Sequence, residues 1–491
     1  MTKFRNMSLL TLAVFLLASC TDIFFTNQNK NAANNSDGVF YARNFVTNND
    51  YELKADKLYE GKKSVVWAER GAGISAELAQ SIANEYDNSI YQRVVDAFSM
   101  KNFTVDHINS QITFDNIMDL ADWLTDGDGK LTILLLDIKD GFKKGVNNSY
   151  TAGYFSSANF YERGRLQNSQ YYSNGRDMIY VDTNPGLASE REQAYATFAH
   201  ELQHLINFVT TWVLDRDPMD TWIDEGLSSQ AEYLYLQKNP ADKLSWFKDD
   251  PAGTIAKGNN FFVWDNHQEE PDSIMDEYAT VYLFFRWLYL QADNDLKQKL
   301  LYNIITSDYA DYQAVTRVAK EINSNWASWE KLLGAWLAAN YIADSNTYGY
   351  KDDPDLKTIK VKMLNVQGNR TPLYPGEGVY SSIVNFPYSP PANPGSNSIK
   401  YAGLSQTASY IYPNAPYSGD VLLTFNGNSD GTKSSETGYL TGAPGSPSPS
   451  GYRSLKGFSG PLVVDAWDIV GRRREPALEK PPIKLLNRVK N

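Results

Sequence analysis

The 491-residue chain contains a single cysteine, Cys20, and only four histidines. A lone cysteine cannot form a disulfide within the chain, so packing has to hold the fold together. Basic residues are also in the minority, because 46 Lys and Arg face 58 Asp and Glu and give a net charge of -12. Without a long basic stripe, this balance argues against nucleic-acid binding. Hydrophobic residues make up 42% of the chain and aromatic residues 13%, which is ample for a sizeable core.

The N-terminal apolar run is too short to cross a membrane. Lys3 and Arg5 precede apolar residues from 9 to 17, whereas a bilayer span needs about 20. This pattern predicts a secretory signal over residues 1–19. The sequence Leu17-Ala18-Ser19-Cys20 resembles a bacterial lipobox and predicts cleavage before Cys20, with lipid attached to its thiol. The alternative is an ordinary signal peptide followed by an incidental cysteine.

This N-terminus predicts a place for the protein in the bacterial cell envelope. A lipid at Cys20 would anchor it to a membrane, facing the periplasm or the exterior. Residues after Cys20 are rich in Asn, Asp, Thr and Lys and show little periodicity. We therefore expect a flexible tether over 20–55.

Hydrophobic periodicity in the rest of the chain predicts an α+β fold. Residues 56–188 are expected to form a mixed sheet with helices packed on it, and residues 189–350 a mainly helical part. The expected strands lie at 64–67, 130–137, 151–160 and 177–182, with a long amphipathic helix over 75–99. Residues 351–472 read as a β-rich domain or a β layer on the preceding unit, with strands at 409–412, 421–425 and 462–467, followed by a polar tail over 473–491.

The most informative stretch is His200-Glu201-Leu202-Gln203-His204. Residues four apart project from the same face of a helix, so His200 and His204 can offer two imidazole nitrogens to one metal ion. Glu201 can then reach a water on that metal without binding the metal itself. Ser189 and Glu192 form a capping box, which supports a helix beginning just upstream.

A third protein ligand is needed, because zinc sites that act on water have three ligands and an open fourth position. Glu225 is the best candidate, since the 20 residues after His204 leave room for a loop and a returning helix. Asp224 and Glu232 on the same expected helix are its competitors. The alternative for an Asp-Glu pair at a helix start is simple interaction with the helix dipole.

These motifs together resemble the hyicolysin-type family, M30, of secreted bacterial metallopeptidases in the gluzincin clan. The matching stretches are His-Glu-Leu-Gln-His-Leu-Ile-Asn-Phe at 200–208 and Asp-Glu-Gly-Leu-Ser at 224–228, and the resemblance is strong over 131–290. It implies a zincin-like catalytic unit that binds one zinc ion through His200, His204 and Glu225. It also implies that Glu201 is the catalytic carboxylate and that Glu232 is a hydrogen-bond partner of a ligand histidine.

The resemblance extends to a tyrosine-led helix at 278–284, where this chain has Ala279 in place of the usual glycine. Either Tyr278 or Tyr282 could face the metal, and the spacing favours Tyr278 as the phenol that stabilises an oxyanion. The alternative is a pair of core tyrosines one turn apart.

The expected function is therefore that of a zinc-dependent endopeptidase acting on polypeptides, with residues 153–159 as an edge strand for the substrate. The chain lacks the Gly-x-Met-Glu-Asn signature of aminopeptidases, which disfavours an exopeptidase. The competing hypothesis is a catalytically silent surface lipoprotein of peptidase fold that acts in binding or adhesion. His107 and His267 have no comparable neighbourhood and are expected to be surface or structural residues.

Overall fold

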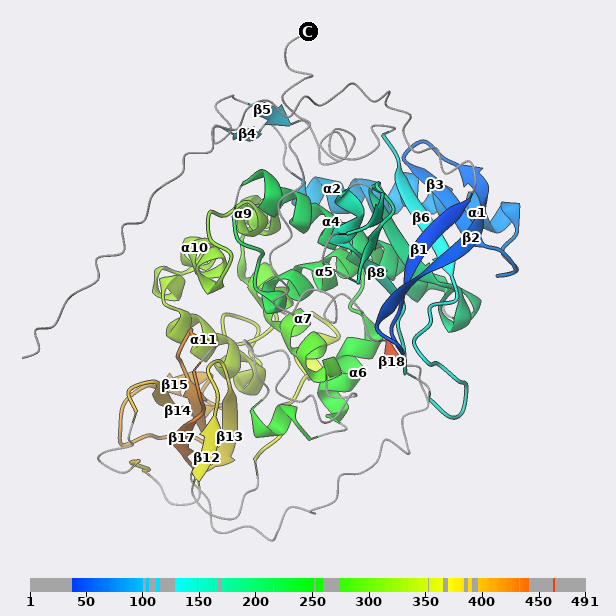
Figure 1. Ribbon diagram of the computed structural model, residues 1–491. Coiled ribbons are helices and arrows are strands. Elements are labelled where there is room, and N and C mark those ends of the chain that lie inside the picture. The colour runs from blue at the N-terminus through cyan, green and yellow to red at the C-terminus, as the bar shows by residue number, and fades with distance from the viewer. Residues whose placement is uncertain are drawn as a thin grey trace, which may run out of the picture.

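The computed structural model confirms the α+β fold (Figure 1). It describes residues 38–99, 129–250, 253–258, 274–364, 370–383, 387–390 and 396–440, except for 148, 162, 167–169, 190, 215, 352 and 432, together with short strands at 103–105, 112–114 and 462–463. Cys20, His107 and His267 lie outside the described residues, as do the expected signal peptide and polar tail. Within the described part, no helix is both long and apolar enough to cross a membrane.

The N-terminal part is built on a six-stranded mixed sheet with the order β1-β2-β3-β6-β11-β8. Its strands are β1 (Val39–Asn44), β2 (Asn49–Glu60), β3 (Ser64–Glu69), β6 (Leu131–Leu136), β8 (Gly153–Phe155) and β11 (Met178–Asp182). β6 pairs in parallel with β3 and with β11, while the other pairs are antiparallel. Every residue of β6 is buried, because alternate side chains enter two different core clusters on the two faces of the sheet.

The first two strands correct the predicted tether. β1 and the first half of β2 fall within 20–55, and they pair in register from Val39 with Lys54 to Asn44 with Asn49. Alternate residues of β1, Phe40 and Ala42, are buried against one face of the sheet. Val39 and Tyr41 alternate with them and are only partly buried. The alternation is thus one of burial more than of polarity, and the average composition of 20–55 does not reveal it.

One long amphipathic helix covers the sheet, as predicted, but it contains a wider turn. α1 (Ala76–Glu85) begins at Ser75, whose side chain accepts a hydrogen bond from the Leu78 amide, and it continues through a π-helical turn at Tyr86–Ile90 into α2 (Tyr91–Phe98). Its buried row has a strict spacing of four residues, which would drift by about 40° per step around an α-helix of 3.6 residues per turn. The wider turn reduces this drift. The row is formed by Ile82, Tyr86, Ile90, Val94 and Phe98, all fully buried.

A group of helices follows the sheet and packs with it in one hydrophobic core. These helices are α4 (Arg191–Val213), α5 (Thr221–Leu236), α6 (Ala241–Asp249), α7 (Ile274–Gln291), α8 (Asn294–Lys297), α9 (Leu300–Ile305), α10 (Tyr312–Ile322) and α11 (Trp329–Ile342). α4 packs against β8 and β11, and α5 packs between α4 and α7. Figure 1 shows α5 and α7 near the middle of the molecule, between the N-terminal sheet and the C-terminal strands.

The C-terminal strands form a layer on the helices. β13 (Gly378–Ser382), β16 (Val421–Asn426), β14 (Ile399–Ser405) and β15 (Tyr410–Tyr412) make a four-stranded sheet in that order, and β12 (Arg370–Leu373) pairs with β17 (Glu436–Tyr439). The Tyr380 hydroxyl donates a hydrogen bond of 2.7 Å to the Leu337 carbonyl of α11. Tyr380 and Phe425 belong to the same core cluster as the helices, so the sheet shares their core.

One predicted C-terminal strand lies elsewhere. β18 (Leu462–Val463) pairs in parallel with β7 (Ser149–Tyr150), next in sequence to the edge strand β8. In Figure 1 it lies near the N-terminal sheet, well apart from β12–β17. The pattern at 462–467 indicated an extended segment but carried no information on its partner, because short apolar strands have little register specificity.

Candidate metal centre

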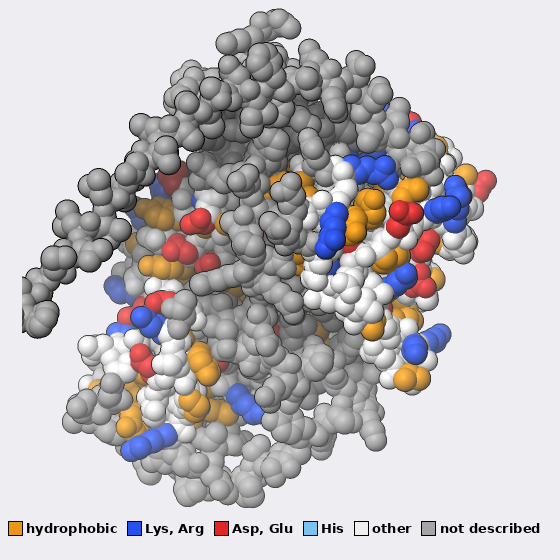
Figure 2. Space-filling view, viewed as in Figure 1, with side chains coloured by type: hydrophobic (Ala, Val, Ile, Leu, Met, Phe, Trp, Pro, Cys, Tyr) orange, Lys and Arg blue, Asp and Glu red, His pale blue; other side chains and the backbone are white. Residues whose placement is uncertain are grey.

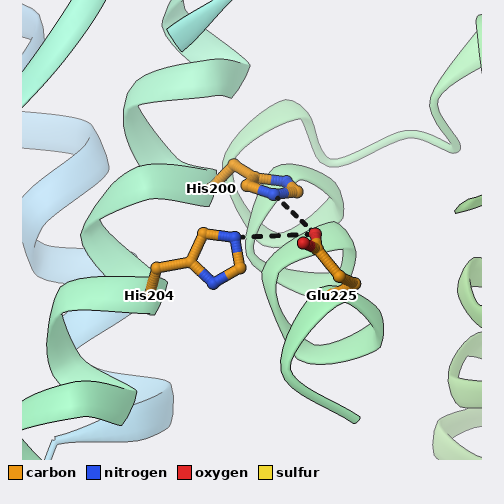
Figure 3. Close-up of side chains that lie close together, drawn as sticks. All are labelled: His200, His204 and Glu225. Atoms are coloured by element: carbon orange, nitrogen blue, oxygen red, sulfur yellow. Dashed lines mark ion pairs between the residues drawn. The ribbon is translucent and has the colours of Figure 1, made fainter. Parts of the chain in front are cut away.

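The two motif histidines lie one turn apart on the same face of α4, as the sequence predicts (Figure 3). Their ring centroids are 4.7 Å apart, and both side chains are buried. α4 ends at Val213, and the chain returns as α5 from Thr221. The two helices pack side by side, which brings the first turns of α5 to the histidines.

Glu225 faces both histidines from α5. Its Oε2 atom lies 3.3 Å from Nε2 of His200 and 3.5 Å from Nε2 of His204. One ligand atom of each of the three residues lies within 4.8 Å of the others, and all three residues are buried. Zinc binds nitrogen and carboxylate oxygen at 2.0–2.2 Å, so the edges of a tetrahedral site measure about 3.3–3.5 Å. The donor atoms thus have the chemistry and the spacing of three corners of a zinc site.

A carboxylate also lies behind each histidine ring. Oε1 of Glu232 is 2.7 Å from Nδ1 of His200, and Oδ2 of Asp224 is 3.1 Å from Nδ1 of His204. Both Nδ1 atoms therefore face carboxylates from α5, and both Nε2 atoms face Glu225. Of the three candidates for the third ligand, Glu225 is therefore the one placed to bind a metal together with the two Nε2 atoms. Asp224 and Glu232 are placed to orient the rings and leave Nε2 for a metal.

Neutral groups complete the surroundings of His204. The Ser228 hydroxyl lies 3.1 Å from Nδ1 of His204, and it is within 2.9 Å of the Asp224 carbonyl, to which it donates. The side-chain amide of Asn207 donates to Oδ1 of Asp224. The Asp224 carboxylate behind His204 thus accepts a hydrogen bond from a neutral donor, the Asn207 amide.

The electrostatics of the cluster favour a cation. Burial by itself lowers the pKa of His204, but the carboxylates of Asp224 and Glu225 raise this pKa well above its ordinary value. Burial raises the pKa of the Glu225 carboxyl, yet the two histidines hold this pKa below its usual range. Positive charge between these groups is therefore stabilised, and a divalent ion can take the place of protons there.

Glu201 lies beside the sheet edge, next to His200 in the same turn of α4, and is fully buried. An ideal Cβ at Gly153 of β8 would lie 2.7 Å from Cγ2 of Thr197 and 3.4 Å from Cγ of Glu201. The absence of a side chain at Gly153 thus lets β8 approach α4 at this turn. The predicted strand at 151–160 is shorter than expected, because residues from Ser157 to Phe160 form a 3₁₀ turn.

The two candidate tyrosines of α7 occupy different surroundings. The Tyr278 ring centroid is 6.5 Å from that of His200, and the side chain is 2% exposed. The Tyr282 hydroxyl donates a 2.6 Å hydrogen bond to Oδ1 of Asn239, in the connection between α5 and α6. Tyr278 is therefore the tyrosine beside the histidine cluster, and Tyr282 is bound elsewhere.

Two contributors to the site were not found from the sequence. Lys243 on α6 lies 2.8 Å and 2.7 Å from the two carboxylate oxygens of Glu232, although no local motif marks it as part of the site. The sequence indicates Asp224 only as a rival metal ligand or as a partner of the helix dipole. The helical spacing of four between Asp224 and Ser228 could have indicated that both reach the same histidine.

Comparison with known proteins supports the geometric assignment. No protein-family model matches the chain. The neutral metalloprotease ShpI of Staphylococcus hyicus is 28% identical to it over 332 residues, which cover 66% of this chain and 67% of the relative. This similarity agrees with the family resemblance of the two helix motifs and with the histidine and glutamate donors that the fold brings together. The similarity to a metalloprotease over two thirds of the chain thus supports the resemblance of these helices to the hyicolysin-type family, M30, of zinc metallopeptidases.

Proposed function

We propose that the protein is a zinc-dependent endopeptidase that cleaves polypeptides at the bacterial cell envelope. The observation that carries this proposal is the buried triangle of His200, His204 and Glu225, with donor separations suited to zinc and with Glu201 on the same helical turn as His200. The relative from Staphylococcus hyicus is named a neutral metalloprotease, which supports the same reaction class.

Each residue then has a distinct part in hydrolysis. His200, His204 and Glu225 would hold a zinc ion, which when bound would supply a Lewis acid for the scissile carbonyl and lower the pKa of a water molecule to about 7. Glu201 accepts the proton of that water as its oxygen attacks the carbonyl carbon, and later donates the proton to the leaving amine. Tyr278, whose ring lies beside that of His200, donates a hydrogen bond from its hydroxyl to the developing oxyanion.

The edge of the sheet offers a place for the substrate backbone. β8 pairs with β11 on one side, and the described strands of this sheet include no partner on the other side. An extended peptide can add there as a further strand, which would place its carbonyl groups along the turn of α4 that carries Glu201. A strand-like binding mode of this kind accepts internal segments of a polypeptide, which supports endopeptidase action.

The envelope location rests on the sequence around Cys20. Two or more acyl chains hold a protein firmly at a membrane, whereas one chain binds only marginally. Replacement of Cys20 by serine should therefore abolish labelling with a fatty-acid probe and release the protein from the membrane fraction. Labelling that persists in this variant would contradict the lipid anchor without affecting the peptidase assignment.

Two measurements test the proposed activity: zinc content and casein hydrolysis. Both are made on the purified wild-type protein and on His204→Ala. We expect one zinc per wild-type chain, with hydrolysis, and loss of both in the variant. A wild-type protein that binds zinc without hydrolysing casein or other unfolded proteins would support the alternative of a silent binding protein of peptidase fold.

A further inference from the structure

A buried lysine stands behind the metal centre. Lys243 is 5% exposed, and its ammonium group contacts both oxygens of Glu232, at 2.8 Å and 2.7 Å. Burying an ammonium group is strongly unfavourable unless a charge of opposite sign and good hydrogen bonds compensate it. Glu232 supplies both, and at 3% exposed it is as well buried as the lysine.

The same carboxylate contacts a metal ligand. Oε1 of Glu232, one of the oxygens that bind Lys243, lies 2.7 Å from Nδ1 of His200. Lys243, Glu232 and His200 therefore form a continuous row of contacts from α6 through α5 to α4.

Lys243 follows Glu232 by 11 residues in the chain, and the backbone between them explains how the two side chains meet. α5 ends at Gln237, which adopts the left-handed conformation with φ of 55°, and α6 begins after Pro240. The chain reverses over this short connection, and the first turn of α6 packs Lys243 back against the last part of α5. Leu244 and Trp246 of α6 are buried in the main core, which fixes the helix in this place.

The two ligand histidines differ in what holds the carboxylate behind them. Asp224, behind His204, accepts from the neutral amide of Asn207, whereas Glu232, behind His200, is paired with a cation. A charged partner that touches both oxygens restricts the rotation of the carboxylate more strongly than a single neutral donor. The carboxylate that contacts His200 is therefore held by a charged residue on a third helix, α6.

We propose that Lys243 is a positioning residue of the metal centre, which holds Glu232 in the one orientation where it accepts from Nδ1 of His200 and leaves Nε2 of His200 directed at the metal. This inference rests on the proposed zinc-peptidase function. Removal of Lys243 leaves a buried carboxylate without its partner, so Glu232 turns away or binds water and His200 loses its fixed ring orientation.

Zinc affinity, measured by competition with a chelator in a set of full-length proteins, tests the proposal. Lys243→Met should weaken zinc binding by about 10- to 100-fold, the effect typical of losing a group that orients a ligand. Glu232→Gln should weaken it within the same range. The double variant removes both charges of the Lys243–Glu232 pair, and it should bind zinc no more weakly than the weaker of the two single variants, because both act through one row of contacts.

Lys248→Met is the matched control, since Lys248 lies on the same helix and its ammonium contacts only the Asp355 carbonyl at 3.5 Å in the described hydrogen bonds. It should bind zinc as the wild type does. The visible absorption spectrum of the cobalt-substituted protein gives a second readout, because it reports ligand geometry. It should change in Lys243→Met and not in Lys248→Met.

Three outcomes would overturn the inference: wild-type zinc affinity in Lys243→Met, tighter binding in that variant, or fully additive losses in the double variant. Tighter binding would mean that the lysine charge repels the metal and does not position a ligand. These outcomes are separable from failure of the proposed function, which would show as a wild-type protein that binds no zinc or cleaves no peptide bond.

Discussion

Gly226 of α5 lies directly against the ring of Phe285 of α7, so that an ideal Cβ at Gly226 would stand 2.2 Å from a carbon of that ring. No side chain other than hydrogen fits at this distance. Gly226 follows the metal ligand Glu225, and α7 carries Tyr278. The close contact of α5 and α7 therefore sets the distance between the metal ligands and the proposed oxyanion donor.

Gly226→Ala should consequently destabilise the protein and disturb the metal centre. Overpacking of a well-packed core typically costs about 1–3 kcal/mol, and relief requires a shift of either helix. We expect a lower free energy of unfolding in urea and weaker zinc binding. Ser229→Ala, a buried change in the same helix that adds no atom, is the control and should alter neither by more than a small amount.

Glu201→Gln separates metal binding from catalysis. The amide keeps the size of the side chain but cannot accept a proton from water, so the variant should bind one zinc and lose about 10²- to 10⁴-fold in the rate of casein hydrolysis. Glu192→Gln is the matched control, because Glu192 lies on the same helix and pairs only with Lys238 at the surface in the described ion pairs. Unchanged hydrolysis by Glu201→Gln would show that another group is the base.

Replacing the three carboxylates of α5 one at a time should give two classes of metal affinity. Glu225→Ala removes a donor that faces both Nε2 atoms and should release zinc. Asp224→Ala and Glu232→Ala remove groups that face Nδ1 atoms, and they should weaken binding by about 10- to 100-fold. Zinc retained at wild-type affinity by Glu225→Ala would refute the assignment of the third ligand.

Tyr278→Phe and Tyr282→Phe form a second comparison. Loss of an oxyanion donor typically lowers kcat by about 10²- to 10³-fold, so Tyr278→Phe should show this loss with its zinc content intact. Tyr282→Phe removes the hydrogen bond to Asn239 and should cost about 1 kcal/mol in stability with little change in kcat. The reverse pattern of kcat values would assign the oxyanion donor to Tyr282.

Glu377→Gln should change how stability depends on pH. Burial in the C-terminal layer raises the pKa of Glu377 from 4.5 to about 8. The neutral form is therefore favoured in the folded state, and the stability that it contributes is lost as pH rises through about 8. In the wild type the Tyr374 amide donates a hydrogen bond of 2.6 Å to Oε2 of Glu377. The glutamine side chain of the variant can still accept this hydrogen bond, but it does not titrate.

Relative to the wild type, the variant should accordingly gain stability between pH 6 and pH 8, by an amount on the order of 2 kcal/mol. Unfolding in urea across this range measures the difference between the two proteins. A difference that stays constant with pH would mean that Glu377 is ionised in the folded protein.

The parts of the fold that the sequence predicted are those with a strong local signal. β6 is a continuous apolar run, and α4 carries two histidines at helical spacing with a return helix at a plausible distance. Glu225 was predicted from the number of ligands that zinc requires, and the structure places it beside both histidines. In each case the residues that decide the structure lie close together in the chain.

The parts that could not be predicted depend on distant partners. β1 has only six residues, and apolar side chains stand at both its buried and its partly buried positions, so its period does not stand out. Phe40 and Ala42 are buried by side chains of strands that lie far away in the sequence. Lys243 reads as an ordinary helix residue, because only the packing of α6 on α5 makes it a neighbour of Glu232. The pairing of β18 with β7 joins segments more than 300 residues apart.

The proposed metal ligands come from two successive helices, so metal binding should be coupled to folding. His204 and Glu225 belong to α4 and α5, so a metal ion held by both would act as a cross-link that closes the connection from 205 to 224. Such a link restricts the unfolded chain and is broken when the helices separate. Chelation should therefore lower the unfolding temperature, and the protein should become susceptible to proteolysis first at the turn between these two helices.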